Sequence, residues 1–307
     1  MTIQPPAPGE PRRPHGPRDP GDAWVVAPTG ERYWGRFGAA GLLAVDPDHG
    51  VLLQHRVSWS HFGDTWALPG GARHEGESAS DGALREAAEE AGVPGAAIRP
   101  RLLSVLDLGY WSYTTLVGDV VESFEATISD PESHELAWVA ADDVARYPLH
   151  PGFAASWEQL RPLLEIRPAV VVDVANVMGS VPDGWWRDRA GAAEKLIRRL
   201  ATLADRGIAA AALDLPEHIW FPEWTAVVEG QARDAAGASG VDVVRAPASG
   251  DDAVFAATVR LVAEGRAVTV VTSDRELAAR TSALTPSTVG APGVAVRGVR
   301  WLLDLLG

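Results

Sequence analysis

Apolar and polar positions follow two different rhythms along the chain, and the change between them falls near residue 167. Before it, short apolar runs with the character of strands are separated by polar stretches. These runs begin at residues 38, 51, 102, 112 and 135. A helical pattern at residues 78–91 interrupts them, and residues 141–166 have a polar helical pattern. Strands broken by one strong helix predict an α+β sandwich for this half.

After Pro168 the apolar runs alternate regularly with helical patterns. Residues 169–174 form a nearly continuous β-branched run, as expected for a strand that is buried on both faces. Further strand patterns begin at residues 208, 225, 241 and 268, and helical patterns cover residues 192–205, 251–264 and 299–306. Alternation of this kind predicts an α/β fold with a doubly wound parallel sheet.

The length of the chain agrees with this division. At 307 residues it has room for about two domains of ordinary size. We therefore expect one domain at residues 21–167 and a second at residues 168–307. Residues 1–20 are rich in Pro, Gly and Arg and have no apolar core, so we expect a disordered tail.

Charge and cysteine content exclude several kinds of chemistry. The net charge of −14 excludes a general basic coat for nucleic acid, although it permits a local basic groove. The absence of cysteine removes disulfides, cysteine–zinc sites and thiol nucleophiles, and it fits the reducing cytoplasm, where we expect the protein to act. No apolar run approaches the twenty or so residues of a membrane span, so we expect no membrane partner.

One helical segment concentrates carboxylates on a single face. Ser78 is a candidate N-cap, and Gly92 followed by Pro94 provides a stop signal. Between them, Glu86 and the pair Glu89 and Glu90 stand at i, i+3 and i+4, so three carboxylates share one side of the helix. Clustered carboxylates repel one another unless a cation lies between them, and hard oxygen ligands favour Mg²⁺ or Mn²⁺.

The residues around this helix resemble the Nudix box. Five residues separate Gly71 from Glu77, seven separate Glu77 from Arg85, and Glu86, Glu89–Glu90 and Gly92–Val93 follow at the required spacing. All seven fixed positions of the box match, and the soft departure is Ala87, which is smaller than the usual aliphatic residue.

The resemblance implies hydrolysis of a nucleoside diphosphate that is linked to another group. It implies that Glu86, Glu89 and Glu90, together with Gly71, hold Mg²⁺ or Mn²⁺. It also implies that Glu89 and Glu90 act in catalysis and that Arg85 and Glu77 organise the loop. A metal held in this way would clamp a pyrophosphate and lower the pKa of its bound water.

Two roles lie outside the box and stay open. The general base is expected to be Glu135, which precedes the run 136–140, with Glu132 as the alternative. Trp34, Trp59 and Trp66 are candidates for stacking on a base or ribose, and core packing is the alternative role for each. Substrate choice is expected to depend on loops at residues 58–65 and 105–112.

A second group of acids falls at strand ends in the C-terminal half. Asp173 ends its apolar run, Asp251 and Asp252 begin a helix, and Asp274 follows another strand pattern. Because the carboxyl ends of parallel strands meet at one edge of a sheet, we expect Asp173, Asp252 and Asp274 to share a divalent metal. Asn176 would orient a ligand, and Asp251 is the alternative to Asp252. Helix capping is the competing role for these aspartates.

This half resembles the NYN branch of the PIN-like nucleases. The resemblance rests on Asp173–Asn176, on Gly250–Asp252, and on Thr272–Asp274 followed by Arg275 and Glu276. It implies a PIN-like fold and metal-dependent cleavage of a phosphodiester.

The sequence therefore predicts a metal-dependent Nudix pyrophosphohydrolase fused to a PIN-like, ribonuclease-like domain. The alternatives are a nucleotide-sensing protein, or an RNA-processing protein, in which the Nudix domain binds ligand and the second domain acts on RNA. Pairing into a homodimer also stays open.

Overall fold

The computed structural model describes residues 1–7, 20–182, 184–284 and 293–307. The chain divides into two compact units, Met1–Leu163 and Leu164–Gly307, just before the boundary that the sequence predicted.

The N-terminal unit is built on a mixed sheet in which β10, β5, β4, β9 and β8 lie side by side in that order. These strands are β4 (Ala39–Asp46), β5 (Gly50–Arg56), β8 (Ile98–Asp107), β9 (Ser112–Val120) and β10 (Ser133–Val139). The β4–β9 pairing is parallel and the others are antiparallel. Short β6 (Trp66–Ala67) pairs with β5, and β7 (Gly70–Ala72) pairs with β4.

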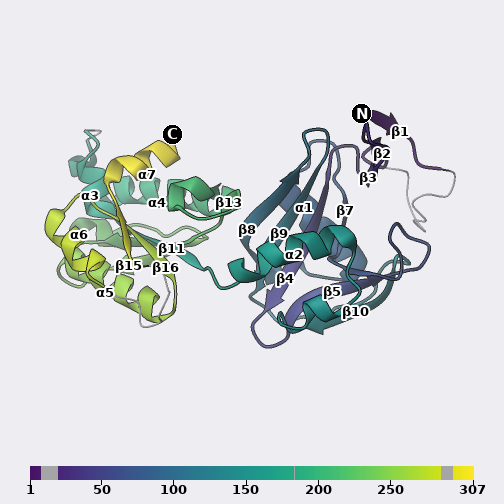
Figure 1. Ribbon diagram of the computed structural model, residues 1–307. Coiled ribbons are helices and arrows are strands. Elements are labelled where there is room, and N and C mark those ends of the chain that lie inside the picture. The colour runs from purple at the N-terminus through teal and green to yellow at the C-terminus, as the bar shows by residue number, and fades with distance from the viewer. Residues whose placement is uncertain (8–19, 183, 285–292) are drawn as a thin grey trace. The chain divides into compact units, whose positions relative to one another are not determined.

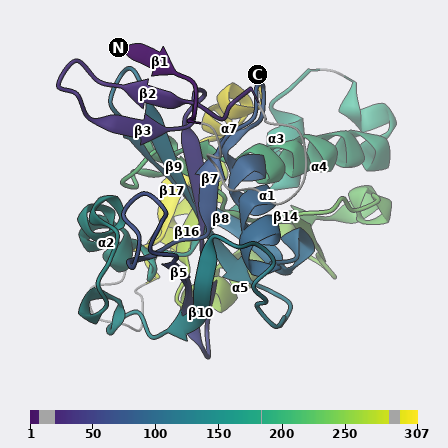
Figure 2. The same ribbon diagram turned by 90° about the vertical axis from the view of Figure 1, so that its right-hand side faces the viewer.

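Two helices flank this sheet on opposite sides, as Figure 2 shows for α1 (Ala79–Ala91) and α2 (Pro151–Leu163). The alanines at positions 83, 87 and 91 of α1 are fully buried, and their small side chains allow the helix to lie close to the sheet. The mixed sheet between two helices agrees with the α+β sandwich predicted for this half. The polar pattern at residues 141–166 contains a 3₁₀ turn, Val144–Arg146, followed by α2.

The ends of α1 follow from the residues that the sequence singled out. The Ser78 hydroxyl accepts a hydrogen bond from the Asp81 backbone N–H at 3.1 Å and donates to the Asp81 carboxylate at 2.6 Å. At the other end Gly92 has φ 65°, a left-handed conformation that favours glycine, and its N–H reaches the Ala88 carbonyl.

A small antiparallel sheet precedes the main sheet and was not predicted. It contains β1 (Thr2–Gln4), β2 (Trp24–Val26) and β3 (Arg32–Trp34), and it lies at the top of Figure 2. The expectation of a disordered tail over residues 1–20 is therefore wrong for residues 2–4, because pairing with β2 satisfies their backbone groups. The part of that tail at residues 8–19 lies outside the described residues.

The C-terminal unit contains a five-stranded sheet in the order β15-β14-β11-β16-β17, and every pairing in it is parallel. The strands are β11 (Pro168–Asp173), β14 (Glu223–Val228), β15 (Val241–Arg245), β16 (Ala267–Val271) and β17 (Ala295–Arg297). Central β11 is buried along its whole length, which explains its continuous apolar run.

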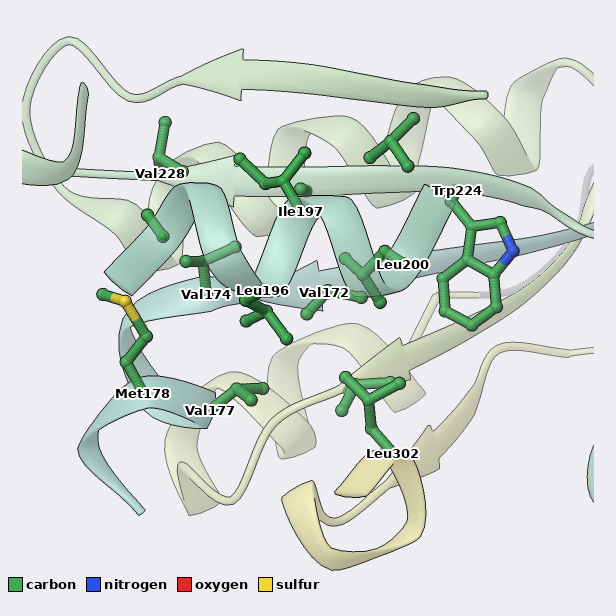
Figure 3. Packing of buried hydrophobic residues seen from close by; sticks show 14 of the residues in the cluster. Val172, Val174, Val177, Met178, Leu196, Ile197, Leu200, Trp224, Val228 and Leu302 are labelled. Carbon is green, nitrogen blue, oxygen red and sulfur yellow. The ribbon is translucent and has the colours of Figure 1, made fainter. Parts of the chain in front are cut away.

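Helices cover both faces of this sheet (Figure 1). They are α3 (Val174–Gly179), α4 (Arg189–Arg206), α5 (Gly250–Ala263), α6 (Arg275–Ser282) and α7 (Val299–Leu306). Val170 and Val172 of β11 pack with α3, α4 and α7, and Figure 3 shows Val172 among Leu196, Ile197 and Leu200. Ala169 and Val171 face the opposite way and pack with α5 and α6. The doubly wound arrangement is thus present in the described residues.

One predicted strand of this sheet is wrong. The run that begins at Ile208 gives only β12 (Ile208–Ala209), which pairs antiparallel with β13 (Ile219–Trp220). Ala210–Leu213 then forms a 3₁₀ turn, because consecutive alanines offer little side-chain surface to a strand. Other 3₁₀ turns are Gly95–Ala97, Trp185–Arg187 and Gly230–Asp234.

The helices that the structure describes include none that is both long and apolar enough to cross a bilayer.

Candidate active site

The N-terminal unit contains a cavity of about 1340 Å³ whose lining differs from one part to another. The carboxylates that line it are Glu86, Glu89 and Glu90 of α1, together with Glu31, Asp130 and Glu132. Aromatic side chains line much of the rest, among them Trp24, Tyr33, Trp34, Trp59, Phe62 and Trp111. A pocket that joins acids to aromatic rings can hold a charged group and a flat organic ring at once.

The turn through Gly70 and Gly71 brings the main chain against the carboxylate helix. The Gly70 N–H donates to Glu90 Oε2 at 2.8 Å. A Cβ at Gly71 would lie 2.7 Å from Glu86 Oε2, so only glycine leaves room for that carboxylate. The sequence assigned Gly71 to the site, and the structure places it beside Glu86.

Arg85 connects the acids of the helix with the loop before it. Its Nε and Nη2 donate to the two carboxylate oxygens of Glu77 at 2.8 and 3.0 Å, and Nη2 also donates to the Ala72 carbonyl at 3.0 Å. Its Nη1 donates to Glu86 at 2.8 Å and to Glu89 at 3.3 Å. The predicted organising role of Arg85 and Glu77 is consistent with these contacts.

The electrostatic state of this helix follows from burial and pairing. Burial raises the pKa of the Glu77 carboxyl, but hydrogen bonds from Arg85 and from the His74 N–H outweigh that effect and leave the pKa lowered. Burial, and after it the charge of Glu86, raises the pKa of Glu90 well above its usual value. Glu86 and Glu90 are only 4% and 5% exposed, so a cation would relieve their mutual repulsion.

The donors present suit a hard divalent cation. Glu86 and Glu90 face the pocket together with Glu89, and all of these donors are oxygens, the ligands that Mg²⁺ and Mn²⁺ prefer. Within the described ranges no three acidic or histidine side chains are already gathered as a metal cluster. Glu86 and Glu89 both turn an oxygen toward Arg85 Nη1, and the half-exposed Glu89 can swing away from it.

Only some of the site residues predicted outside the Nudix box line the pocket. Trp34 and Trp59 line the pocket, whereas Trp66 is buried and stacks on His55 with ring centroids 4.8 Å apart. Trp66 therefore packs within the fold, as the alternative role proposed. Glu132 lines the pocket, and Glu135 on β10 is exposed and does not.

Arg56 is a pocket residue that sequence reasoning missed. It is the last residue of β5, and among the described residues its buried Nε has no hydrogen-bond partner. Its positive charge lowers the pKa of Glu90, in opposition to burial, and after burial it helps to lower the pKa of His61 and His150. No motif marks this arginine, and the signal available was its position at the end of a strand just before a predicted substrate loop.

The C-terminal unit brings some of the predicted aspartates to one edge of its sheet. Thr272 donates its hydroxyl to Asp173 Oδ2 at 3.0 Å and accepts the Asp274 N–H at 3.1 Å. The Asn176 side-chain oxygen accepts the Ser273 N–H at 2.8 Å. This edge is the end of β11 and β16, where the strand order reverses, which is where open α/β sheets bind ligands.

The choice between Asp252 and its alternative Asp251 as the third ligand stays a prediction, but the contacts of the two residues differ. Asp252 forms an ion pair with Arg280 at 3.0 Å. The charge of Asp251 acts on Asp173, and Asp251 in turn is affected by the charges of Asp274 and Glu229 and, in the opposite sense, by Arg280. Adjacent residues at a helix start point about 100° apart, so only one of the two can face the strand ends. Burial, followed by the charges of Asp274 and Glu229, raises the pKa of Asp251.

Asp173 also caps α3, since its carboxylate accepts the Asn176 N–H at 3.0 Å, and Asp274 caps α6 in the same way. Burial raises the pKa of Asp173, and Asp251 and Glu229 add to this, against hydrogen bonds from Asn176 and Thr272. The capping role that competed with a metal site is thus real for both residues.

Taken by its fold and site, the N-terminal unit is an α/β domain of the class that hydrolyses phosphate anhydrides with a carboxylate helix. The NUDIX domain profile matches residues 35–160. The "Putative 8-oxo-dGTP diphosphatase 3" of Mycobacterium tuberculosis is 51% identical over 154 residues, which cover 47% of this chain and 70% of that protein. The chain therefore belongs to the Nudix family, and its N-terminal domain is a Nudix pyrophosphohydrolase domain.

Two further similarities concern the same half of the chain. A "Nucleoside triphosphate pyrophosphatase/Nudix hydrolase fusion protein" of Bifidobacterium longum is 38% identical over 159 residues, which cover 48% of this chain and 32% of that protein. The crystal structure of the M. smegmatis Nudix hydrolase RenU has 48% identity and a TM-score of 0.43, with 47% of this chain and 95% of that chain covered. Nudix hydrolases generally use divalent metal ions.

Proposed function

We propose that the N-terminal domain hydrolyses the pyrophosphate bond of a nucleoside diphosphate derivative, with 8-oxo-dGTP as the first substrate to test. The observation that carries this proposal is a single pocket that contains buried carboxylates, the cation Arg56 and aromatic rings, of which Trp59 and Phe62 are exposed. The choice of 8-oxo-dGTP rests on the name of the mycobacterial relative at 51% identity.

Each part of the pocket has a task in this reaction. Glu86, Glu89 and Glu90 and the Gly71 carbonyl would hold Mg²⁺ or Mn²⁺, which supplies charge neutralisation at the phosphates and a more acidic water when bound. Arg85 and Glu77 keep the helix and the Gly70–Gly71 turn in register with each other. Arg56 would donate to a phosphate oxygen, because its buried Nε has no other partner among the described residues.

Glu132 is our candidate for the general base, in preference to Glu135, because Glu132 reaches the pocket and Glu135 does not. Its carboxylate would take a proton from the attacking water while Arg56 holds the phosphate. Glu132→Gln should lower kcat and leave KM nearly unchanged. An unaltered pH–rate profile in Glu132→Gln would assign the base elsewhere.

The test of the main proposal is turnover of 8-oxo-dGTP and dGTP by the full chain with Mg²⁺, with release of pyrophosphate or phosphate identified. Glu89→Gln and Glu90→Gln should each lower kcat by at least about a hundredfold, because each keeps shape but removes a charge. Glu158→Gln is the matched control, since Glu158 is exposed on α2 and outside the pocket. Wild-type rates in both pocket variants at saturating Mg²⁺ would refute the assignment.

A second candidate function concerns the C-terminal domain, which we propose to be PIN-like and to cleave RNA with a divalent metal at Asp173, Asp251 and Asp274. Support comes from the placement of buried Asp173, with its raised pKa, at the switch point of a parallel sheet. Single-stranded RNA cleavage with Mn²⁺ should be lost in Asp173→Asn and kept in Asp252→Asn. Unchanged cleavage in Asp173→Asn would refute the metal site, and the role of Asp173 and Asp274 would then be helix capping.

A further inference from the structure

Part of the pocket wall comes from a segment outside the matched Nudix residues. The family match begins at residue 35, but Trp24, Arg32, Tyr33 and Trp34 of β2 and β3 all line the cavity. Strand register places Trp24 opposite Trp34, and their rings meet edge to face at 4.9 Å. The small N-terminal sheet therefore completes the pocket.

A continuous row of rings joins this sheet to the rest of the pocket. The Arg32 guanidinium lies over the Trp24 ring, 4.2 Å from its centroid, and Trp24 meets His61 at 5.2 Å. His61 contacts Phe62 at 4.3 Å, and Phe62 contacts His150 at 4.8 Å. All five side chains line the cavity, although they come from three separate parts of the sequence.

The loop at residues 57–65 holds one of these rings in a costly conformation. Phe62 has φ 54°, in the left-handed region that a bulky side chain rarely occupies, and it is 47% exposed at the pocket. The Gly63 N–H donates to the Ser60 carbonyl at 2.9 Å and keeps the turn closed. An exposed ring that is kept in a strained backbone conformation is suited to contact with a ligand.

The two arginines of the pocket take different places along it. Arg56 lies opposite Ser133 of β10, and the Ser133 hydroxyl donates to the Glu90 carbonyl at 3.5 Å, so Arg56 lies near the carboxylates. The Arg32 guanidinium lies over Trp24 on the N-terminal sheet, on a ring that in turn meets His61. Arg56 is thus close to where the phosphates would bind, and Arg32 stands beyond His61 among the aromatic rings.

We propose that Arg32, held over Trp24, reads the base of the substrate and selects purines that carry an oxygen at position 6. This inference rests on the proposed nucleotide hydrolysis and adds the residue that determines specificity. A guanidinium is a donor only, so it pairs with the O6 acceptor of guanine, 8-oxoguanine or hypoxanthine. Adenine presents an amino donor at that position, and two donors facing each other leave both without a partner.

The test compares kcat and KM of the full chain for dITP and dATP, which differ at position 6, and for dGTP and 8-oxo-dGTP. Arg32→Ala should raise KM for the three 6-oxo nucleotides roughly tenfold to hundredfold, with kcat nearly unchanged and dATP little affected. Arg32→Lys keeps the charge but loses the planar fork, so it should restore only part of the preference.

Arg36→Ala is the matched control. Arg36 is also exposed and lies over a ring, that of Phe37 at 5.3 Å, but it does not line the pocket. It should leave all four nucleotides unchanged. Thermal unfolding of each variant checks that the fold is kept.

The outcomes separate the two proposals. Hydrolysis with the same dITP-to-dATP ratio in wild type and Arg32→Ala overturns the role of Arg32 and leaves the hydrolase intact. If the wild type cleaves none of the nucleotides, the proposed function fails, and titration calorimetry of dITP and dATP with Mg²⁺ then decides on Arg32. A preference for dITP that Arg32→Ala abolishes supports the base-reading site, and equal or absent binding overturns it.

Discussion

Replacement of Arg85 by glutamine tests whether this one cation stabilises the cluster of acids on α1 in the folded domain. The side chain is 19% exposed and donates to Glu77, Glu86, Glu89 and the Ala72 carbonyl. Its loss removes the 2.8 Å ion pair of the buried Glu86 carboxylate, whose charge also acts on buried Glu90. We therefore expect the N-terminal domain to lose stability without any change of hydrophobic packing.

The magnitude follows from burial. Breaking a buried ion pair by removal of one partner costs about 3–5 kcal/mol, and the partial exposure of Arg85 favours the lower end of that range. The pair with Glu89 adds little, because Glu89 is half exposed. A loss of about 3 kcal/mol corresponds to a fall in Tm of roughly 6–12 °C for a domain of this size.

The assay is calorimetry of the full chain at pH 7 with EDTA, so that bound metal does not mask the effect. The difference should shrink on acidification. The pKa of Glu77 is lowered in the folded state, so its contribution is complete above its unfolded value of 4.5 and is lost as pH falls through the lower folded value.

Arg161→Gln is the control for this prediction. Arg161 pairs with Asp142 at 2.6 Å, but the two side chains are 55% and 82% exposed. That change should alter stability by less than about 1 kcal/mol. If Arg85→Gln costs no more than Arg161→Gln, Arg85 does not hold the acids together in the way we describe.

Further predictions concern the same domain. Gly71→Ala should lower kcat/KM about tenfold to hundredfold, because the added Cβ displaces the Glu86 carboxylate, whereas Gly95→Ala, which meets open space, should not. EDTA should abolish hydrolysis, and Mg²⁺ or Mn²⁺ should restore it; activity that persists in EDTA contradicts the metal assignment. Burial, together with Arg56, lowers the pKa of His150 to about 4. Between pH 6.5 and 4 the imidazole is therefore protonated in the unfolded chain but neutral in the folded protein. Stability should therefore fall as pH drops from 6.5 to 4, and His150→Gln should flatten that part of a Tm–pH curve. Ser78→Ala should cost about 1 kcal/mol in urea unfolding, through loss of the helix cap.

Local signals in the sequence were sufficient for the carboxylate helix and for most of the C-terminal sheet. Ser78 and Gly92 set the ends of α1, and the spacing of Glu86 and Glu90 places both on the buried side. The unbroken apolar run of β11 likewise predicted its central place. Such features depend on residues within a few positions of one another, whose geometry is that of one helix or one strand.

Tertiary structure decided which acids meet. Asp252 forms an ion pair with Arg280, whereas the charge of Asp251 acts on Asp173, and one residue of helix register changes the direction of a side chain by about 100°. Glu132 reaches the pocket and Glu135 does not, although only two residues separate them. In both cases the sequence narrows the candidates to two acids that lie close together in the chain. Which of the two faces the site depends on how its helix or strand packs.

Sequence reasoning named Trp34 and Trp59 among the aromatic residues of the pocket, but it did not predict the row of rings that crosses it. Its row of rings joins Trp24 to His61 and Phe62 to His150, pairs that are far apart along the chain. The sequence by itself determined the carboxylate helix, since its contacts lie within one short segment. The packing of the N-terminal sheet against the 57–65 loop determined where Arg32 stands, because contacts between distant segments leave no local pattern.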